Sequence, residues 1–120
     1  MTSGYLSKRL QSIGYALNGV KTLLSTQAHA RLHLLATLLV IGAGFFVRLR
    51  RWEWVAILLC IGMVWLAEAL NTALEFLADE VSLEQRDRIG KSKDVAAGGV
   101  LITAIVAITI AALVFWNHLR

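Results

Sequence analysis

Hydrophobic and polar residues follow one another in four blocks, and each block has the spacing or the length of a helix. In residues 5–25 the apolar side chains recur every three or four positions, so they form one stripe on an otherwise polar helix. The stripe consists of Leu6, Leu10, Ile13, Leu17, Val20 and Leu24. This pattern predicts an amphipathic helix lying in the membrane interface, and the alternative is a helix that packs on a soluble partner.

Three later blocks are apolar enough, and long enough, to cross a bilayer as helices. The first is interrupted only near its two ends, the second contains two glutamates as its only charges, and the third contains no charge. The three predicted spans are residues 32–49, 54–78 and 95–116. We therefore expect an all-α membrane protein with an N-terminal surface helix and three transmembrane helices, joined by a loop over residues 79–94.

Composition supports a single small membrane domain over residues 1–120. Of the 120 residues 58% are hydrophobic, and the mean hydropathy is +0.66. A chain of this length cannot bury so much apolar surface in its own core, so lipid must cover much of it. Cys60 is the one cysteine, so no disulfide can form within the chain. It lies inside an apolar block.

The basic residues indicate an orientation in the membrane. Eight of the 12 Lys and Arg residues lie before the first span or between the second and third spans, and four lie on the other side. The positive-inside rule then places the N-terminal helix and the 79–94 loop in the cytoplasm. The net charge of +4 is explained by this flanking pattern and by anionic lipid, and we do not expect nucleic acid as a partner.

Polar side chains line one face of the second predicted span. A carboxylate in the hydrocarbon costs between roughly 2.5 and more than 10 kcal/mol, so these acids must face something other than lipid. With spacings of 3, 4, 7 and 11 they fall within one stripe of a helix. The stripe is formed by Glu68, Asn71, Thr72, Glu75 and Asp79. Carboxylates on one wall bind a hard cation such as Mg²⁺, or take a proton from a hydroxyl group.

The segment that follows this stripe supplies cations close to the third span. Lys91 and Lys93 are well placed to contact phosphate groups, and Asp94 is expected to cap a helix that begins at Val95. Acids, an amide and lysines on the cytoplasmic side indicate nucleotide chemistry on a substrate that resides in the membrane.

Other sites suggested by short motifs are less consistent with the sequence. Gly90–Ser92 resembles the end of a P-loop, but the first glycine of that motif would fall at Gln85, and no buried strand precedes it. His29 and His33 have a spacing of four but lack a third ligand, so we interpret them as interfacial residues rather than as a zinc site. The polar stripe has its own alternative, namely hydrogen bonding between helices without any chemistry.

Four stretches of the chain resemble a known family. Their order and spacing are similar to those of the prokaryotic diacylglycerol kinase family, which includes undecaprenol kinases. The stretches are GYALNGVKTLL, ARLHLLATLLVIGAGFF, EALNTALEFLADEVS and GKSKDVAAGGVL, and the resemblance extends over nearly the whole chain. The resemblance implies a homotrimer of three-span subunits in which neighbouring subunits share the active sites.

The resemblance also implies roles for individual residues. Glu68 matches the proposed catalytic base, and Asn71 matches a residue that organises the site. Glu75 matches the acid that binds the metal. The residues that match the nucleotide-binding positions are Asp79, Lys93, Asp94 and, on the surface helix, Arg9 or Lys8 beside it.

The chain departs from the family at one metal-binding position. Near the end of the surface helix, where the family usually has a second glutamate, the sequence has Gln27. An amide oxygen can still bind Mg²⁺, but it contributes no charge, so the ion would depend more on Glu75 and on the phosphates of ATP.

These features lead to one main functional hypothesis and two rivals. The main hypothesis is a lipid kinase of the bacterial inner membrane that uses ATP and Mg²⁺ to phosphorylate the hydroxyl of diacylglycerol or undecaprenol. One rival is a small proton-coupled transporter with Glu68 as the proton carrier, which leaves Glu75 and Asp79 unused. The other is a membrane scaffold without catalysis, which leaves all of the inward acids unexplained.

Overall fold

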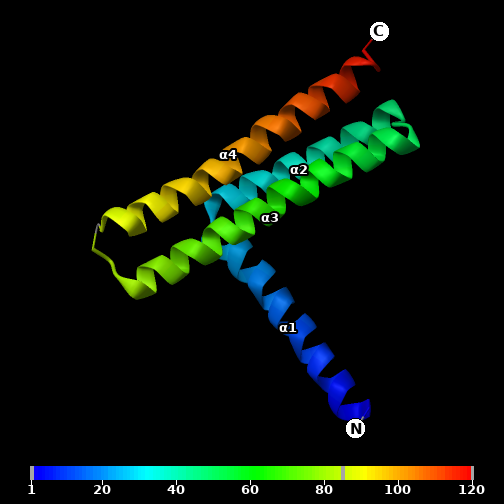
Figure 1. The fold of residues 1–120 in the computed structure, drawn as a ribbon. Coiled ribbons are helices and arrows are strands. Elements are labelled where there is room, and N and C mark those ends of the chain that lie inside the picture. The colour runs from blue at the N-terminus through cyan, green and yellow to red at the C-terminus, as the bar shows by residue number, and fades with distance from the viewer. Residues whose placement is uncertain (1, 85, 120) are drawn as a thin grey trace.

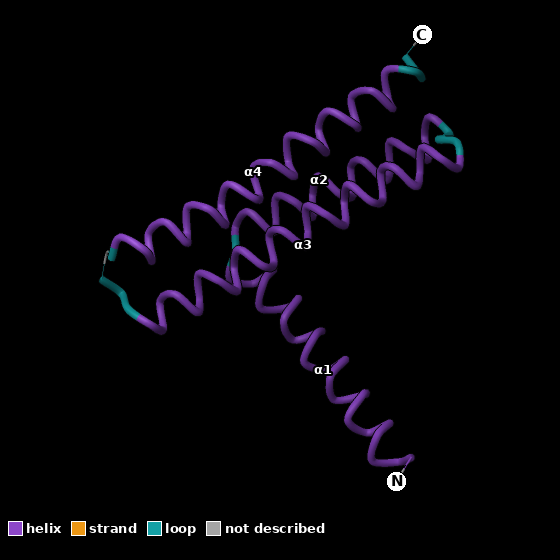
Figure 2. The backbone as a smooth tube through the Cα atoms, in the orientation of Figure 1, coloured by secondary structure: helices purple, strands orange, loops and turns teal. Residues whose placement is uncertain are grey.

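The computed structural model describes residues 2–84 and 86–119, which form four helices (Figure 1). The helices are α1 (Thr2–Thr26), α2 (Ala28–Val47), α3 (Arg51–Val81) and α4 (Asp87–Trp116). Only short turns connect them, and the described part of the chain has no strand (Figure 2). α2, α3 and α4 are each long and apolar enough to cross a membrane. The predicted all-α fold with three spanning helices is therefore confirmed.

Helix α1 stands apart from the other three helices and runs across their long axis (Figure 1). Its apolar stripe is uncovered, with Leu6, Leu10 and Leu17 each 60–65% exposed. Only near its end does α1 bury a large apolar side chain, that of Leu23, close to its junction with α2. A helix with a free apolar stripe, set across a spanning bundle, is suited to rest in the membrane interface.

Helices α2, α3 and α4 pack side by side, with the most extensive contact between α3 and α4. The buried core is small and centres on Leu49, Ile57 and Val114. It lies near the turn between α2 and α3 and the end of α4, far from the connection between α3 and α4. Most other large apolar side chains of the bundle are exposed, so lipid or further copies of the chain must cover them.

The turn between α2 and α3 depends on a close approach of two helices. Arg48 ends α2 in the left-handed conformation (φ 60°), and the Leu49 N–H donates to the Gly44 carbonyl at 3.0 Å. This is the geometry that commonly closes helix C-termini. A Cβ atom on Gly44 would lie 2.7 Å from the Trp54 ring, so only glycine fits where α2 meets α3.

A buried polar pair ties the end of α4 to the start of α3. The Glu53 carboxylate accepts the Arg50 N–H at 2.8 Å, which satisfies a free donor at the start of α3. The same carboxylate contacts His118 Nε2 at 2.9 and 3.0 Å. Glu53 is only 1% exposed, so this pair fixes the C-terminal end of α4 against the turn between α2 and α3.

The helix ends differ from the predicted ones, most of all in the connection before the third span. The loop expected over residues 79–94 is helical at both ends, because α3 continues to Val81 and α4 begins at Asp87. Asp94 therefore lies inside α4 and does not cap it, and the prediction of a cap there was wrong. Hydropathy marks only the part of a helix that lipid covers, whereas backbone hydrogen bonds and pairs such as Lys91–Asp87 (3.1 Å) extend the helix into water.

The other bounds shift by a few residues. The surface helix expected over residues 5–25 begins at Thr2 and ends at Thr26, and the helix of the first span begins at Ala28 rather than at residue 32. That helix ends before residue 49, because the left-handed Arg48 stops it.

The lengths of the helices place their ends relative to a bilayer. With 20 residues α2 is about 30 Å long, which matches the hydrocarbon thickness, whereas α3 (31 residues) and α4 (30 residues) are about 45 Å long. Figure 1 shows the joined ends of α3 and α4 projecting past the start of α2. These last turns of α3 and first turns of α4 are the parts that extend beyond the hydrocarbon.

Candidate active site

The polar stripe of α3 runs from a buried end to an exposed end. Glu68 is 4% exposed and Thr72 is 5% exposed, whereas Asn71 and Glu75 are half-buried and Asp79 is exposed. The stripe therefore begins inside the bundle and ends on the projecting part of α3.

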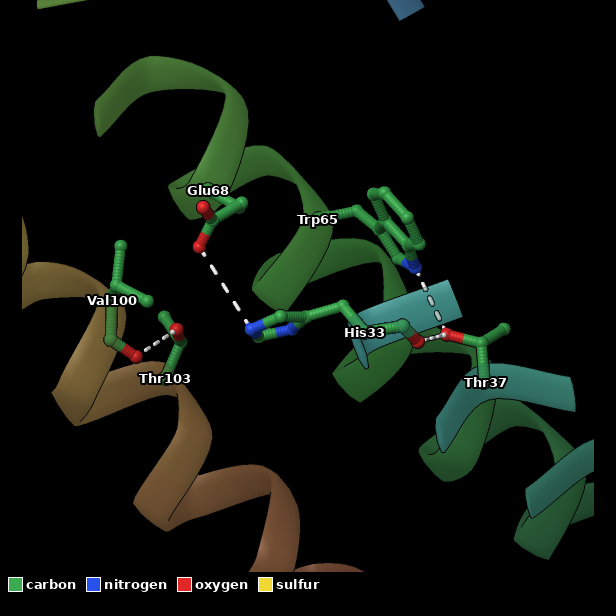
Figure 3. A network of polar contacts seen from close by, with 6 residues as sticks. All are labelled: His33, Thr37, Trp65, Glu68, Val100 and Thr103. Atoms are coloured by element: carbon green, nitrogen blue, oxygen red, sulfur yellow. Dashed lines mark hydrogen bonds and ion pairs between the residues drawn. The ribbon is translucent and has the colours of Figure 1, made fainter. Parts of the chain in front are cut away.

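Glu68 faces a histidine of α2. His33 Nε2 lies 3.8 Å from Glu68 Oε2, and Figure 3 shows the two side chains directed toward one another. The sequence predicted an interfacial residue at His33, and that prediction did not include a contact with Glu68. His29, one turn earlier on α2, is exposed as that interpretation requires.

A short network fixes the surroundings of the His33 ring (Figure 3). The Trp65 indole N–H donates to Thr37 Oγ1 at 2.9 Å, and the Thr37 hydroxyl donates to the His33 carbonyl at 2.7 Å. The Trp65 and His33 rings also meet edge to face, with centroids 6.3 Å apart. Trp65 thus connects α3 to α2 by a hydrogen bond as well as by packing.

The exposed end of the stripe carries a close ion pair. Lys93 Nζ on α4 lies 2.6 Å from Asp79 Oδ1 on α3, so these two residues from the predicted nucleotide-binding set are brought together. Asp94 follows Lys93 on α4 and is exposed. These charges lie on the projecting ends of α3 and α4, where a soluble anion can reach them.

Two buried polar atoms on the same stripe have no hydrogen-bond partner among the described residues. They are Asn71 Oδ1 and Thr72 Oγ1. An unsatisfied buried polar group costs about 1–3 kcal/mol, so native proteins seldom keep one without a reason. Both atoms lie about one helical turn from Glu68, in the direction of Glu75.

Two residues assigned to the site from the sequence lie elsewhere in a single chain. Arg9 stacks over the Tyr5 ring at 4.9 Å on the outer half of α1, which Figure 1 shows far from α3 and α4. Gln27 lies at the bend between α1 and α2, where its Nε2 donates to Thr26 Oγ1 at 3.2 Å. The structure does not bring Arg9 to Asp79 and Lys93.

The donors on the stripe have the chemistry that magnesium prefers. Glu75 supplies a half-buried carboxylate, and Asn71 supplies an unpaired amide oxygen one turn away. Within the described residues no three His, Cys, Asp or Glu side chains form a metal-binding group. Because Mg²⁺ is usually held by one or two carboxylates together with the phosphates of a substrate, this donor set fits the ion.

Comparison with known proteins identifies the family. The prokaryotic diacylglycerol kinase family matches residues 14–115. The chain belongs to this family. It is 32% identical over 110 residues to an undecaprenol kinase of Bacillus subtilis, with 92% of this chain and 89% of the relative covered. It is 26% identical over 117 residues to the diacylglycerol kinase of Escherichia coli K12, with 98% of this chain and 95% of the relative covered.

Family membership confirms the resemblance seen in the sequence and makes the chain a membrane lipid kinase that uses ATP. Together with the three spanning helices, it also identifies the chain as a membrane protein.

His33, Thr37 and Trp65 are the residues of the site that sequence reasoning did not assign. A signal for His33 was present, because an ionisable residue inside a span usually has a polar partner within the bundle. The same rule that applies to the acids of α3 predicts a polar partner for His33. The contact of Trp65 with Thr37 joins residues 28 positions apart and leaves no local pattern.

Proposed function

We propose that this lipid kinase transfers the γ-phosphoryl group of ATP to the primary hydroxyl of a membrane lipid, diacylglycerol or undecaprenol. One observation carries the proposal. A single helix face joins a carboxylate buried in the bundle, Glu68, to an ion pair exposed beyond it, Asp79–Lys93. Such a face lets a lipid hydroxyl from the bilayer and a nucleotide from water approach the same wall.

Glu68 is the proposed base. It accepts the proton of the lipid hydroxyl while the oxygen forms a bond to the γ-phosphorus, and the bond between that phosphorus and the bridging oxygen breaks. The electron pair of the broken bond leaves with ADP. In phosphoryl transfer most of the catalysis comes from positioning and electrostatics, and Glu68 held in a fixed place on α3 supplies the positioning.

The remaining residues of the wall orient the two substrates. Lys93 offsets negative charge on the phosphates, and Asp79 holds the lysine in place at 2.6 Å. Asp94 contributes on the nucleotide side. Asn71 offers its unpaired amide oxygen between the two ends of the site.

Magnesium, when bound, would supply positive charge that neutralises the phosphates of ATP. Glu75 is the proposed protein ligand, with Gln27 as a second and neutral one.

We propose a homotrimer with shared sites as the working form. Arg9 cannot act with Asp79 and Lys93 of its own chain in this arrangement, because α1 extends away from its own bundle. Cyclic symmetry then gives each site one α1 from a neighbouring chain. The basic residues near α1 and between α3 and α4 support a site that faces the cytoplasm at the bacterial inner membrane.

A direct assay tests the function and its lipid specificity. Purified protein in mixed micelles is given ATP labelled in the γ-phosphate and either diacylglycerol or undecaprenol, and label in the lipid is measured. Transfer of label to at least one lipid is expected, and the better substrate identifies the branch. Proton-coupled transport in vesicles, with no label in either lipid, would instead favour the transporter.

A further inference from the structure

We infer that His33 is a positioning residue for Glu68 and receives from it the proton that the lipid hydroxyl loses. The inference rests on the proposed function, in which Glu68 is the base. His33 lies on α2, outside the polar stripe of α3, and has no role in the proposed function as described above.

The first reason is the contact itself. Each of the two side chains lies in an apolar helix, where an ionisable group is costly unless it has a partner. They meet across two helices at 3.8 Å, with Oε2 of Glu68 facing Nε2 of His33. This distance is longer than a hydrogen bond, and a side-chain movement of about 1 Å would close it. Catalytic hydrogen bonds often shorten in this way when the substrate binds.

The second reason is that the structure holds the histidine in place. Trp65 packs edge to face against the ring and is itself held by Thr37, whose hydroxyl bonds the backbone of His33 (Figure 3). Trp65 thus restricts the ring, and this packing keeps Nε2 directed at Glu68. Thr103 on α4 does not compete for it through its hydroxyl, which donates to the Val100 carbonyl at 2.8 Å.

The third reason is the difference in exposure within the pair. The Glu68 side chain is 5% exposed and the His33 side chain is 22% exposed, so His33 is the more accessible member of the pair. After each turnover Glu68 holds a proton that must leave before the next one. Histidine exchanges protons readily near neutral pH, so it is suited to pass this proton outward.

The proton balance is simple. The proton moves from Glu68 to the unprotonated Nε2 of a neutral His33, which becomes an imidazolium, and then from His33 to bulk water. Glu68 returns to its carboxylate form and His33 to its neutral form. The step needs no oxidant, reductant or further reactant.

Among the charged and titratable groups near His33, Glu68 is the one that its ring faces. From α3 it faces Glu68, and from α4 the groove beside it is lined by alanine and isoleucine. On α2 itself the neighbouring charged or titratable groups, His29 and Arg31, are exposed. From α1 the charge closest in sequence to the junction is Lys21, which is also exposed.

The test compares His33→Gln with His29→Gln, a matched change of an exposed histidine one turn away. For His33→Gln we expect kcat to fall by on the order of tenfold to a hundredfold, with the KM values for ATP and lipid unchanged. The acid side of the kcat profile should lose one ionisation, because a coupled pair has become a single group. His29→Gln should match the wild type in both measurements.

Chemical rescue separates this role from a structural one. His33 lines a groove of about 230 Å³, so His33→Ala leaves room for a small base. Added imidazole should restore part of the kcat of His33→Ala and leave the wild type unchanged. Gel filtration and thermal unfolding in detergent confirm that each variant is folded.

Either of two results would overturn the inference. One is an unchanged kcat and pH profile in His33→Gln, and the other is a folded His33→Ala variant that imidazole does not rescue. Both presuppose a wild type that phosphorylates lipid. If the wild type phosphorylates no lipid at all, the proposed function fails, and that outcome is distinct from failure of the role of His33.

Discussion

Glu68 lies at the depth where the polar stripe of α3 enters the apolar part of the bundle, and this position defines its chemistry. A carboxylate at the exposed end of the stripe would meet only water and nucleotide. At its buried end it can meet the hydroxyl of a lipid that stays in the bilayer. Toward the loop the stripe ends at the exposed Asp79, and this order fits the proposed approach of the two substrates.

Replacing the proposed base gives the first prediction. Glu68→Gln keeps the size of the side chain but cannot accept a proton, so we expect lipid phosphorylation to fall by about 10²- to 10⁴-fold. The variant should still fold and assemble, as gel filtration will show. Glu80→Gln, a change of an exposed acid on the same helix, is the control and should stay active. Full activity in Glu68→Gln would remove Glu68 from the mechanism.

Gln27 gives a prediction of improved function. If it contributes to magnesium binding as a neutral ligand, Gln27→Glu adds a negative charge and strengthens a hard-cation site. We expect half-maximal activity at a several-fold lower Mg²⁺ concentration, measured by titration at saturating ATP.

The matched control is Gln11→Glu, which adds the same charge at an exposed position of α1. An equal effect of both changes would mean that surface charge, and not ligation by residue 27, attracts the ion.

At the scale of elements, the buried core lies at one end of the bundle, and the nucleotide side of the proposed site lies at the other end. The core residues and the Glu53–His118 pair fix the turn between α2 and α3 and the end of α4. The opposite ends of α3 and α4 extend beyond the start of α2 and carry the ion pair. Stability and function are thus concentrated at opposite ends of the same helices.

Gly44 tests the packed end. A methyl group there would lie 2.7 Å from Trp54 and 2.9 Å from Leu49, so Gly44→Ala should lower the free energy of unfolding by about 1–3 kcal/mol. Nothing lies within 4 Å of the corresponding position at Gly42, so Gly42→Ala should have the opposite effect, because alanine favours a helix by roughly 0.5–1 kcal/mol. Thermal unfolding in detergent measures both. A stabilised Gly44→Ala variant would contradict the described contact of α2 with α3.

At the scale of the whole molecule, a single chain holds only part of the proposed site. The stripe of α3 and Lys93 of α4 lie together, but α1 carries Arg9 away from them. The extensive uncovered apolar surface of the bundle also leaves room for contacts between chains.

Mixing inactive subunits tests whether sites are shared. Arg9→Ala and Glu68→Gln are each expected to be inactive alone, and subunits of the two are mixed and reassembled in equal amounts. In a shared site one subunit supplies Arg9 and its neighbour supplies Glu68, so roughly a quarter of the sites in a cyclic trimer should be intact. Lipid phosphorylation near that level is the expected result. No recovery in reassembled trimers would show that each chain builds its own site.

The sequence was sufficient for the family, the number of spans and the polar stripe of α3. Lipid selects long apolar helices, and the helical period then decides which acids share a face, so both follow from local order along the chain. The resemblance in short motifs needed no three-dimensional information either. The roles of Glu68, Glu75 and the other assigned residues stay predictions that the assays above will test.

Only the tertiary structure decided the relations between helices. The contacts of His33 with Glu68 and of Glu53 with His118 join residues far apart in sequence, and their geometry depends on how α2, α3 and α4 pack. Hydropathy likewise does not predict that α3 and α4 stay helical beyond their apolar segments. Local pattern fixes which face of each helix is polar, but the register between helices fixes which polar groups meet.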